Sequence, residues 1–193
     1  KIEASDKATG SRLETAMNLV ADVQPGFEEL LIDVWRRHLA TAAQRGVTYA
    51  DIPPAYLAHL DAEALPACLS TLVVGGEVAP PHEVRRLAER VALFNVYGPT
   101  EATICTSLGR CDAAWSRSLL GQPIAGNTYE LEPHEGLPPG EGELLIAGRG
   151  LALGYHRDEA LTARRFVLRA GRRWYRTGDV VRLSATARTA SGR

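Results

Sequence analysis

Apolar positions in the first half of the chain alternate between helical spacing and short continuous runs. Leu30, Leu31 and Val34 recur near helical spacing inside a helix-rich stretch, residues 13–43. Runs rich in Val, Ile and Leu that stop at Pro or Gly are typical of buried strands. We therefore expect strands at 47–52, 69–74 and 91–96, separated by helices at 55–60 and 82–90.

The pattern changes from about Gly121 onward. Strands are expected at 128–131 and 143–147, joined by a link rich in Gly and Pro. Two further segments with apolar residues, at 174–175 and 180–183, flank the polar segment Arg176-Thr177-Gly178-Asp179. This spacing indicates an antiparallel β unit.

Together these patterns predict an α/β protein. Strand, helix and strand with short connections indicate a parallel sheet with flanking helices, a flavodoxin-like subdomain, over residues 1–120. A β-rich, barrel-like subdomain is expected over 121–183, and residues 184–193 form a small polar tail.

Composition narrows the class of function. Lys and Arg number 22 and Asp and Glu 23, so the net charge of −1 argues against a nucleic acid or an anionic membrane as partner. The three cysteines are odd in number and lack C-x₂-C spacing, which favours a reducing compartment. No apolar run approaches the roughly 20 residues of a membrane span. We expect a cytoplasmic protein and, because the chain starts at Lys1 and not Met, a piece of a longer one.

Chemistry-bearing residues follow two of the expected strands. Ligands bind at the carboxyl ends of parallel strands, where this chain carries Gly75-Gly76-Glu77 and the segment 95–101. Tyr97 offers a flat face for a base, Thr100 a hydroxyl for phosphate, and Glu101 a hard oxygen ligand for Mg²⁺. Taken singly, each also fits a plain turn or a solvated side chain.

Three longer motifs make a family resemblance. Residues 95–104 resemble an NxYGPTE motif, residues 142–155 a GELxIxGxGxAxGY motif, and residues 175–179 a YRTGD motif. In this order they resemble the adenylate-forming enzymes, specifically the amino-acid adenylation domains of non-ribosomal peptide synthetases. The resemblance covers about residues 6–183.

The resemblance implies a set of nucleotide-binding residues. Tyr97 would stack on the adenine of ATP, Thr100 and Glu101 would address phosphate and Mg²⁺ as catalytic residues, and Asp179 would accept hydrogen bonds from the ribose hydroxyls. A carboxylate suits a vicinal diol, although Asp179 after a glycine also fits a turn. The remaining positions implied at the nucleotide are Gly75, Gly76, Glu77, Asn95 and Gly98.

The same resemblance implies an amino-acid pocket. Its members would be Val73, Gly75, Val96, Ile104 and Cys105, which lie within or beside the motifs and the similar strand end at 72–77, together with Asp51, Asp6, Lys7 and Gly10. Asp6 would pair with the α-ammonium group of the substrate, although a helix N-cap is the alternative. A buried, unpaired Asp51 would favour a basic side chain in the substrate, unless Lys7 neutralises it; small or polar neutral side chains stay open.

The implied reaction joins an amino acid to ATP, giving aminoacyl-AMP for transfer to the phosphopantetheine thiol of a carrier protein, with neighbouring synthetase domains as partners. Two alternatives remain: an acyl-CoA or aryl-acid ligase, and a non-catalytic interaction module. The sequence shows neither a Ser/Thr/Gly-rich phosphate loop followed by Lys nor the family's distal lysine-bearing domain. Charge stabilisation dominates this chemistry, so we expect the chain alone to be a poor catalyst.

Overall fold

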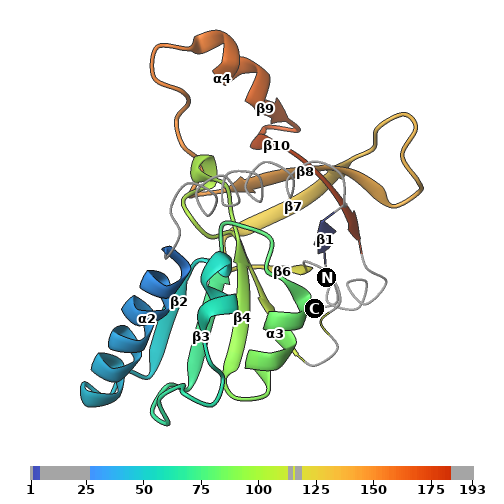
Figure 1. The fold of residues 1–193 in the computed structure, drawn as a ribbon. Helices are drawn as coiled ribbons and strands as arrows, with labels where there is room; N and C mark the ends of the chain where they lie inside the picture. The colour runs from blue at the N-terminus through green and yellow to red at the C-terminus, as the bar shows by residue number, and fades with distance from the viewer. Residues whose placement is uncertain (1, 5–26, 113–114, 116–118, 184–193) are drawn as a thin grey trace. The chain divides into compact units, whose positions relative to one another are not determined.

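The computed structural model describes residues 2–4, 27–112, 115 and 119–183 (Figure 1). Its contacts divide the chain into two compact units. The α/β unit comprises Asp6–Phe94 and Arg110–Ser116, and the β unit comprises Lys1–Ser5, Asn95–Gly109 and Arg117–Arg193.

The α/β unit holds the helices and strands expected from the first half of the sequence. Strands β2 and β3 pair in parallel, with Asp51 opposite Val73. Strand β4 is the next neighbour of β3 and continues from this unit into the β unit. In chain order the elements are α2 (Phe27–Gln44), β2 (Tyr49–Ile52), the 3₁₀ helix η1 (Pro54–His59), β3 (Thr71–Gly75), α3 (Pro81–Ala88) and β4 (Ala92–Tyr97).

Helix α3 shows how the sequence builds this unit. Pro81 occupies the start of the helix, where its missing N–H leaves no hydrogen bond unmade. Val84 and Leu87 are fully buried on one face. On the other, the Arg86 guanidinium donates to Glu83 and, at 3.0 Å, to the carbonyl oxygen of Leu57 in η1. An apolar face buries α3 in this unit, and Arg86 binds the helix to η1.

The β unit is antiparallel in its described strand pairs. Its strands follow the order β4-β5-β6-β1-β10-β8-β7, and β9 pairs with β10. Leu144, Ile146 and Val181 are fully buried on one side of β8, while Leu145 and Ala147 pack with Trp174 on the other. The elements are β1 (Ile2–Ala4), the 3₁₀ helix η2 (Thr100–Ala102), β5 (Ser107–Arg110), β6 (Leu119–Pro123), β7 (Asn127–Glu132), β8 (Glu141–Gly148), α4 (Glu159–Arg165), β9 (Phe166–Arg169) and β10 (Arg172–Leu183).

Several features of the β unit differ from the sequence prediction. Four of its strands were not expected, namely β1, β5, β6 and β9. In addition, the segments 174–175 and 180–183 belong to one long strand, β10, whose pairing with β8 shifts register between Arg176 and Val180. Helix α4 was not predicted, because none of its residues is buried and the sequence therefore carries no apolar stripe. Asp158 caps this helix by accepting from the Leu161 N–H at 2.8 Å.

The structure confirms part of the predicted fold and leaves other parts as predictions. The α/β class and the antiparallel β-rich part are confirmed, but a flavodoxin-like arrangement is not shown. The boundaries at 120 and 183 remain proposals, and residues 13–26 and the tail 184–193 lie outside the described residues. None of the helices in the described ranges is both long and apolar enough to span a membrane.

Candidate functional site

The end of β4 and the register shift of β10 bring two predicted nucleotide residues together. The Tyr97 hydroxyl donates a short hydrogen bond to Oδ2 of Asp179, across 82 residues of sequence. Burial raises the pKa of the Tyr97 phenol, and the neighbouring Asp179 charge raises it further. Tyr97 therefore stays protonated and remains a donor to the carboxylate.

A bulge in β10 presents Asp179. Gly178 adopts φ +81°, a conformation that side chains rarely tolerate. The Thr177 hydroxyl donates to the Leu144 carbonyl oxygen at 2.8 Å, and the Asp179 N–H donates to Thr177 Oγ1 at 3.0 Å. The turn that the sequence left as an alternative at this place is a bulge, fixed to β8 on one side.

Glu101 lies in η2 within a cluster of phenols. The Tyr155 hydroxyl donates to Oε1 of Glu101 at 2.5 Å, and the Tyr155 and Tyr175 hydroxyl oxygens lie 3.4 Å apart. Burial alone would raise the pKa of Glu101, but hydrogen bonds from Tyr155, its own backbone and Tyr175, with the Arg165 charge, lower it overall. The site thereby holds Glu101 as a carboxylate.

The motifs contain both tyrosines, but the sequence alone assigned them no role. Tyr155 closes the second motif and Tyr175 opens the third. Burial raises the pKa of Tyr175, and its hydrogen bond with Tyr155 raises it further. The available signal was that both tyrosines belong to motifs of the resemblance. The motif letters do not show which side chains meet, so the contact with Glu101 could not be predicted.

A single carboxylate defines the candidate metal site. Carboxylate oxygen is a ligand that Mg²⁺ accepts, and Mg²⁺ commonly binds one or two carboxylates together with substrate phosphates and waters. Within the part of the chain that the structure describes, no three His, Cys, Asp or Glu side chains gather into a metal cluster. Glu101 therefore fits Mg²⁺ only as one ligand beside phosphate oxygens, with the exposed Thr100 next to it.

The loop after η2 is tightly folded. A Cβ on Gly98 would lie 2.5 Å from the carbonyl oxygen of Ile104, so this position accepts only glycine without rearrangement. Thr103 and Ile104 both have positive φ, at 60° and 59°, although both are β-branched. Ile104 is nonetheless 82% exposed. Backbone strain of this kind concentrates at functional sites.

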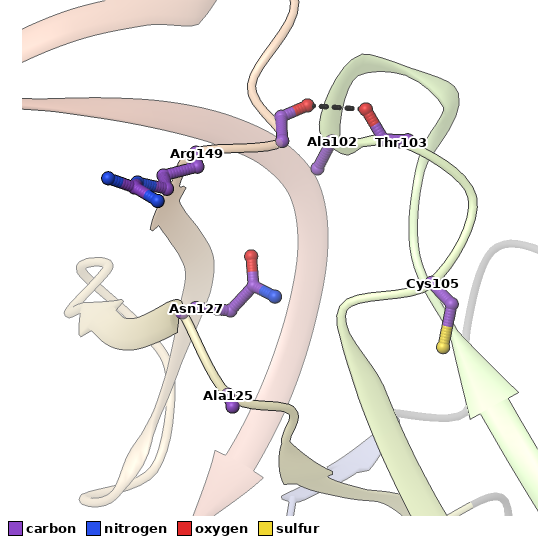
Figure 2. A pocket seen from close by; sticks show the side chains of 8 residues that line it. Ala102, Thr103, Cys105, Ala125, Asn127 and Arg149 are labelled. Atoms are coloured by element: carbon purple, nitrogen blue, oxygen red, sulfur yellow. Dashed lines mark hydrogen bonds between the residues drawn. The ribbon is translucent and has the colours of Figure 1, made fainter.

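A pocket of about 230 Å³ borders this loop (Figure 2). The Thr103 hydroxyl donates to the Gly150 carbonyl oxygen at 2.7 Å, and the Asn127 side chain points into the hollow while Arg149 points away. Cys105, a predicted substrate residue, lies on its wall. The lining residues are Ala102, Thr103, Cys105, Ala125, Gly126, Asn127, Arg149 and Gly150.

Other predicted residues lie in the α/β unit. Gly75 ends β3, and Gly76 and Glu77 follow it, with Gly76 at φ +85°. Val73 is buried. Asp51 is exposed, so the desolvation argument for a basic substrate does not apply to it in this structure.

Of the remaining predicted residues, Asn95 and Val96 are described by the structure, and three others are not. Asn95 is buried and its Nδ2 donates to the Leu119 carbonyl oxygen at 2.9 Å, so its amide joins backbone segments of the β unit. Val96 is partly buried in β4. Asp6, Lys7 and Gly10 lie outside the described residues.

Comparison with known proteins matches this chain to a family. Residues 18–156 match the model of the AMP-binding enzyme family. A linear gramicidin synthase of Brevibacillus parabrevis is 42% identical over 154 residues, which is 75% of this chain and 2% of that protein. Novobiocin biosynthesis protein H of Streptomyces niveus is 39% identical over 165 residues, 82% of this chain and 27% of that protein.

Solved structures agree. PA1221, described as a non-ribosomal peptide synthetase protein containing adenylation and PCP domains, superposes with a TM-score of 0.67 at 31% identity, over 75% of this chain and 32% of its own. The N-terminal subdomain of Klebsiella oxytoca NpsA, in complex with 3-hydroxybenzoyl-AMSN, superposes with a TM-score of 0.67 at 26% identity, over 78% of this chain and 42% of its own.

The chain belongs to the AMP-binding enzyme family. The predicted resemblance to the adenylation domains of non-ribosomal peptide synthetases is also confirmed. The chain spans less than a third of the length of these curated relatives.

Proposed function

We propose that this chain forms the adenosine-binding part of an enzyme that activates an amino acid with ATP. The reaction would yield aminoacyl-AMP and pyrophosphate, and the aminoacyl group would pass to the phosphopantetheine thiol of a carrier protein. One observation supports this most: Tyr97 and Asp179, from two motifs that imply adenine and ribose contacts, meet directly in the β unit.

The carboxylate of Asp179 is the proposed ribose ligand. A carboxylate has about four lone-pair sites, so accepting from Tyr97 leaves capacity for a ribose hydroxyl. Because Tyr97 fixes one oxygen, the orientation of the carboxylate is set before nucleotide binds. The ring of Tyr97 offers the adjoining face to adenine.

Glu101 and Thr100 are the proposed residues on the phosphate side. The hydrogen bond from Tyr155 helps to lower the pKa of Glu101, which is therefore a carboxylate at neutral pH, the form that a cation requires. Mg²⁺ bound there would neutralise charge on the departing pyrophosphate. Thr100, exposed beside it, would donate its hydroxyl to a phosphate oxygen.

An amino acid is the proposed acid substrate. The similarity to PA1221, described as a non-ribosomal peptide synthetase protein, supports this class at 31% identity. The complex of the NpsA subdomain with 3-hydroxybenzoyl-AMSN, at 26% identity, favours the aryl-acid alternative. The proposed pocket residues are Val73, Gly75, Val96, Ile104 and Cys105 with Asp51, Asp6, Lys7 and Gly10. Because Asp51 is exposed, they do not favour a basic side chain over a small or polar neutral one. A carrier protein is the proposed acceptor, since the similar PA1221 contains a PCP domain.

Nucleotide binding tests the proposal. Calorimetric titration of the 193-residue chain with AMP should show binding, which Asp179→Asn weakens about tenfold or more, as expected for a hydrogen bond to a charged group. The exposed Glu130 on β7 supplies a control, and Glu130→Gln should bind as the unchanged chain does. No binding to the unchanged chain would favour a non-catalytic interaction module instead.

Whether the enzyme activates an amino acid or an aryl acid needs a separate measurement. In an enzyme that joins this chain to the rest of an adenylation domain, pyrophosphate exchange is compared with basic, small neutral and aromatic amino acids and with 3-hydroxybenzoate. The proposal expects exchange with an amino acid. Exchange with 3-hydroxybenzoate alone would establish the aryl-acid alternative.

A further inference from the structure

The bulge that presents Asp179 rests on a buried carboxylate of the neighbouring strand. Glu143, on β8, is only 6% exposed. Its Oε1 accepts from the Gly178 N–H at 2.9 Å, and its Oε2 accepts from Nε and Nη2 of Arg176 at 3.1 and 2.6 Å. One side chain thus binds the backbone immediately before Asp179 and the side chain three residues before it.

From these contacts we propose that Glu143 is a positioning residue for the ribose-binding carboxylate of Asp179, an inference that rests on the proposed function. The hydrogen bonds of Glu143 go to the Gly178 N–H and to Arg176, neither of which is assigned to the nucleotide. It acts through the bulge, because Gly178 keeps φ +81° while its N–H is bound to Oε1. The orientation of Asp179 toward Tyr97 follows from that backbone path.

Charged groups of the adjoining elements surround the bulge. Arg165 of α4 donates from Nη1 to the Arg176 carbonyl oxygen at 3.4 Å, and the same nitrogen lies 3.1 Å from where a Cβ on Gly178 would be. Nη2 of Arg176 also pairs with Glu132 of β7 at 2.6 Å. His134 lies 3.9 Å from Oε2 of Glu143. The bulge is therefore fixed from β8 by Glu143 and from α4 by Arg165.

This role differs from that of a purely stabilising ion pair. An ion pair that only stabilised the sheet would change the free energy of unfolding without changing nucleotide affinity in the folded protein. A positioning residue changes affinity only as long as Asp179 is present to be positioned. A double-mutant cycle separates the two cases.

The experiment measures the Kd of AMP by calorimetry for the unchanged chain, Glu143→Gln, Asp179→Asn and the double variant. Gln keeps an oxygen for the Gly178 N–H but turns a donor toward Arg176, so Glu143→Gln should weaken binding about tenfold. In the Asp179→Asn background the same change should have no further effect. Glu141→Gln, two residues away on the same strand, is the matched control and should leave the Kd unchanged.

Two outcomes overturn the inference. Either Glu143→Gln binds AMP as tightly as the unchanged chain while Asp179→Asn does not, or its effect is as large in the Asp179→Asn background as without it. If Asp179→Asn itself leaves the Kd unchanged, the proposed function fails instead.

A second variant covers the case in which Glu143→Gln does not fold. Thr177→Val removes the hydroxyl that accepts from the Asp179 N–H and donates to Leu144, with little change in shape. It should also weaken AMP binding only while Asp179 is present. An effect of equal size in both backgrounds would again contradict the inference.

Discussion

Side chains from motifs far apart in the sequence hydrogen bond to one another in the β unit. Tyr97 meets Asp179, and Tyr155 meets Glu101 across 54 residues. The motifs allowed the identity of Tyr97, Glu101 and Asp179 to be predicted as chemistry-bearing residues. They could not predict these contacts, because spacing along the chain does not show which strands become neighbours. The hydrogen bonds of Glu143 to the bulge could not be predicted for the same reason.

Glu143 should make stability depend on pH in the acid range. Burial opposes its ionisation, but hydrogen bonds from Arg176 and the Gly178 N–H lower its pKa below the ordinary 4.5. As pH falls below about 4.5, the unfolded state binds the proton first, so the free energy of unfolding decreases until the native carboxyl also titrates. Urea unfolding from about pH 6 to about pH 3 should show a shallower decrease for Glu143→Gln than for Glu141→Gln. An equal decrease in the free energy of unfolding for both variants would contradict a lowered pKa for Glu143.

Tyr155 should control the ionisation of Glu101. Because its hydroxyl hydrogen bond lowers the pKa of Glu101, Tyr155→Phe should move that pKa upward. The carboxyl carbon chemical shift of Glu101, followed by NMR against pH, measures the change. Tyr49→Phe, at an exposed tyrosine of β2, should have no such effect. An unchanged Glu101 pKa in Tyr155→Phe would show that the contact is not electrostatically important.

At the scale of elements, burial decided what could be predicted. Strands β3, β4 and β8 were expected because their apolar runs are buried, and the Pro and Gly residues around them mark their ends. Helix α4 was missed because it buries no residue. The bulge in β10 looked like a turn because Thr-Gly-Asp fits both, and only pairing with β8 distinguishes them.

Gly121 and Gly136 allow the stability cost of close packing to be distinguished from the cost of an unfavourable backbone conformation. Gly121 and Gly136 have nearly equal φ, +84° and +87°, but a Cβ on Gly121 would overlap the Leu108 carbonyl oxygen, whereas Gly136 has open space. Gly136→Ala should cost about 1–2 kcal/mol of unfolding free energy from conformation alone. Gly121→Ala should cost about 1–3 kcal/mol more, because β5 and β6 must move apart. Equal losses in urea unfolding would mean that β5 and β6 do not pack this closely.

At the scale of the whole molecule, the proposed reaction needs more charge stabilisation than this chain carries. Nucleotidyl transfer depends on groups that neutralise the phosphates, and the sequence has no Ser/Thr/Gly-rich loop followed by Lys. We therefore expect the purified 193-residue chain to bind AMP without measurable amino-acid-dependent pyrophosphate exchange. Clear exchange above a reaction without protein would show that the residues present suffice.

The central claim is that Asp179, oriented by Tyr97, recognises the ribose diol. The most direct measurement compares the Kd of AMP with that of 2′,3′-dideoxy-AMP for the unchanged chain and for Asp179→Asn. The account predicts that the unchanged chain binds AMP about tenfold or more tightly than the dideoxy analogue, and that Asp179→Asn loses most of this preference. Equal affinity of the unchanged chain for both nucleotides, or a preference that survives Asp179→Asn, would contradict it.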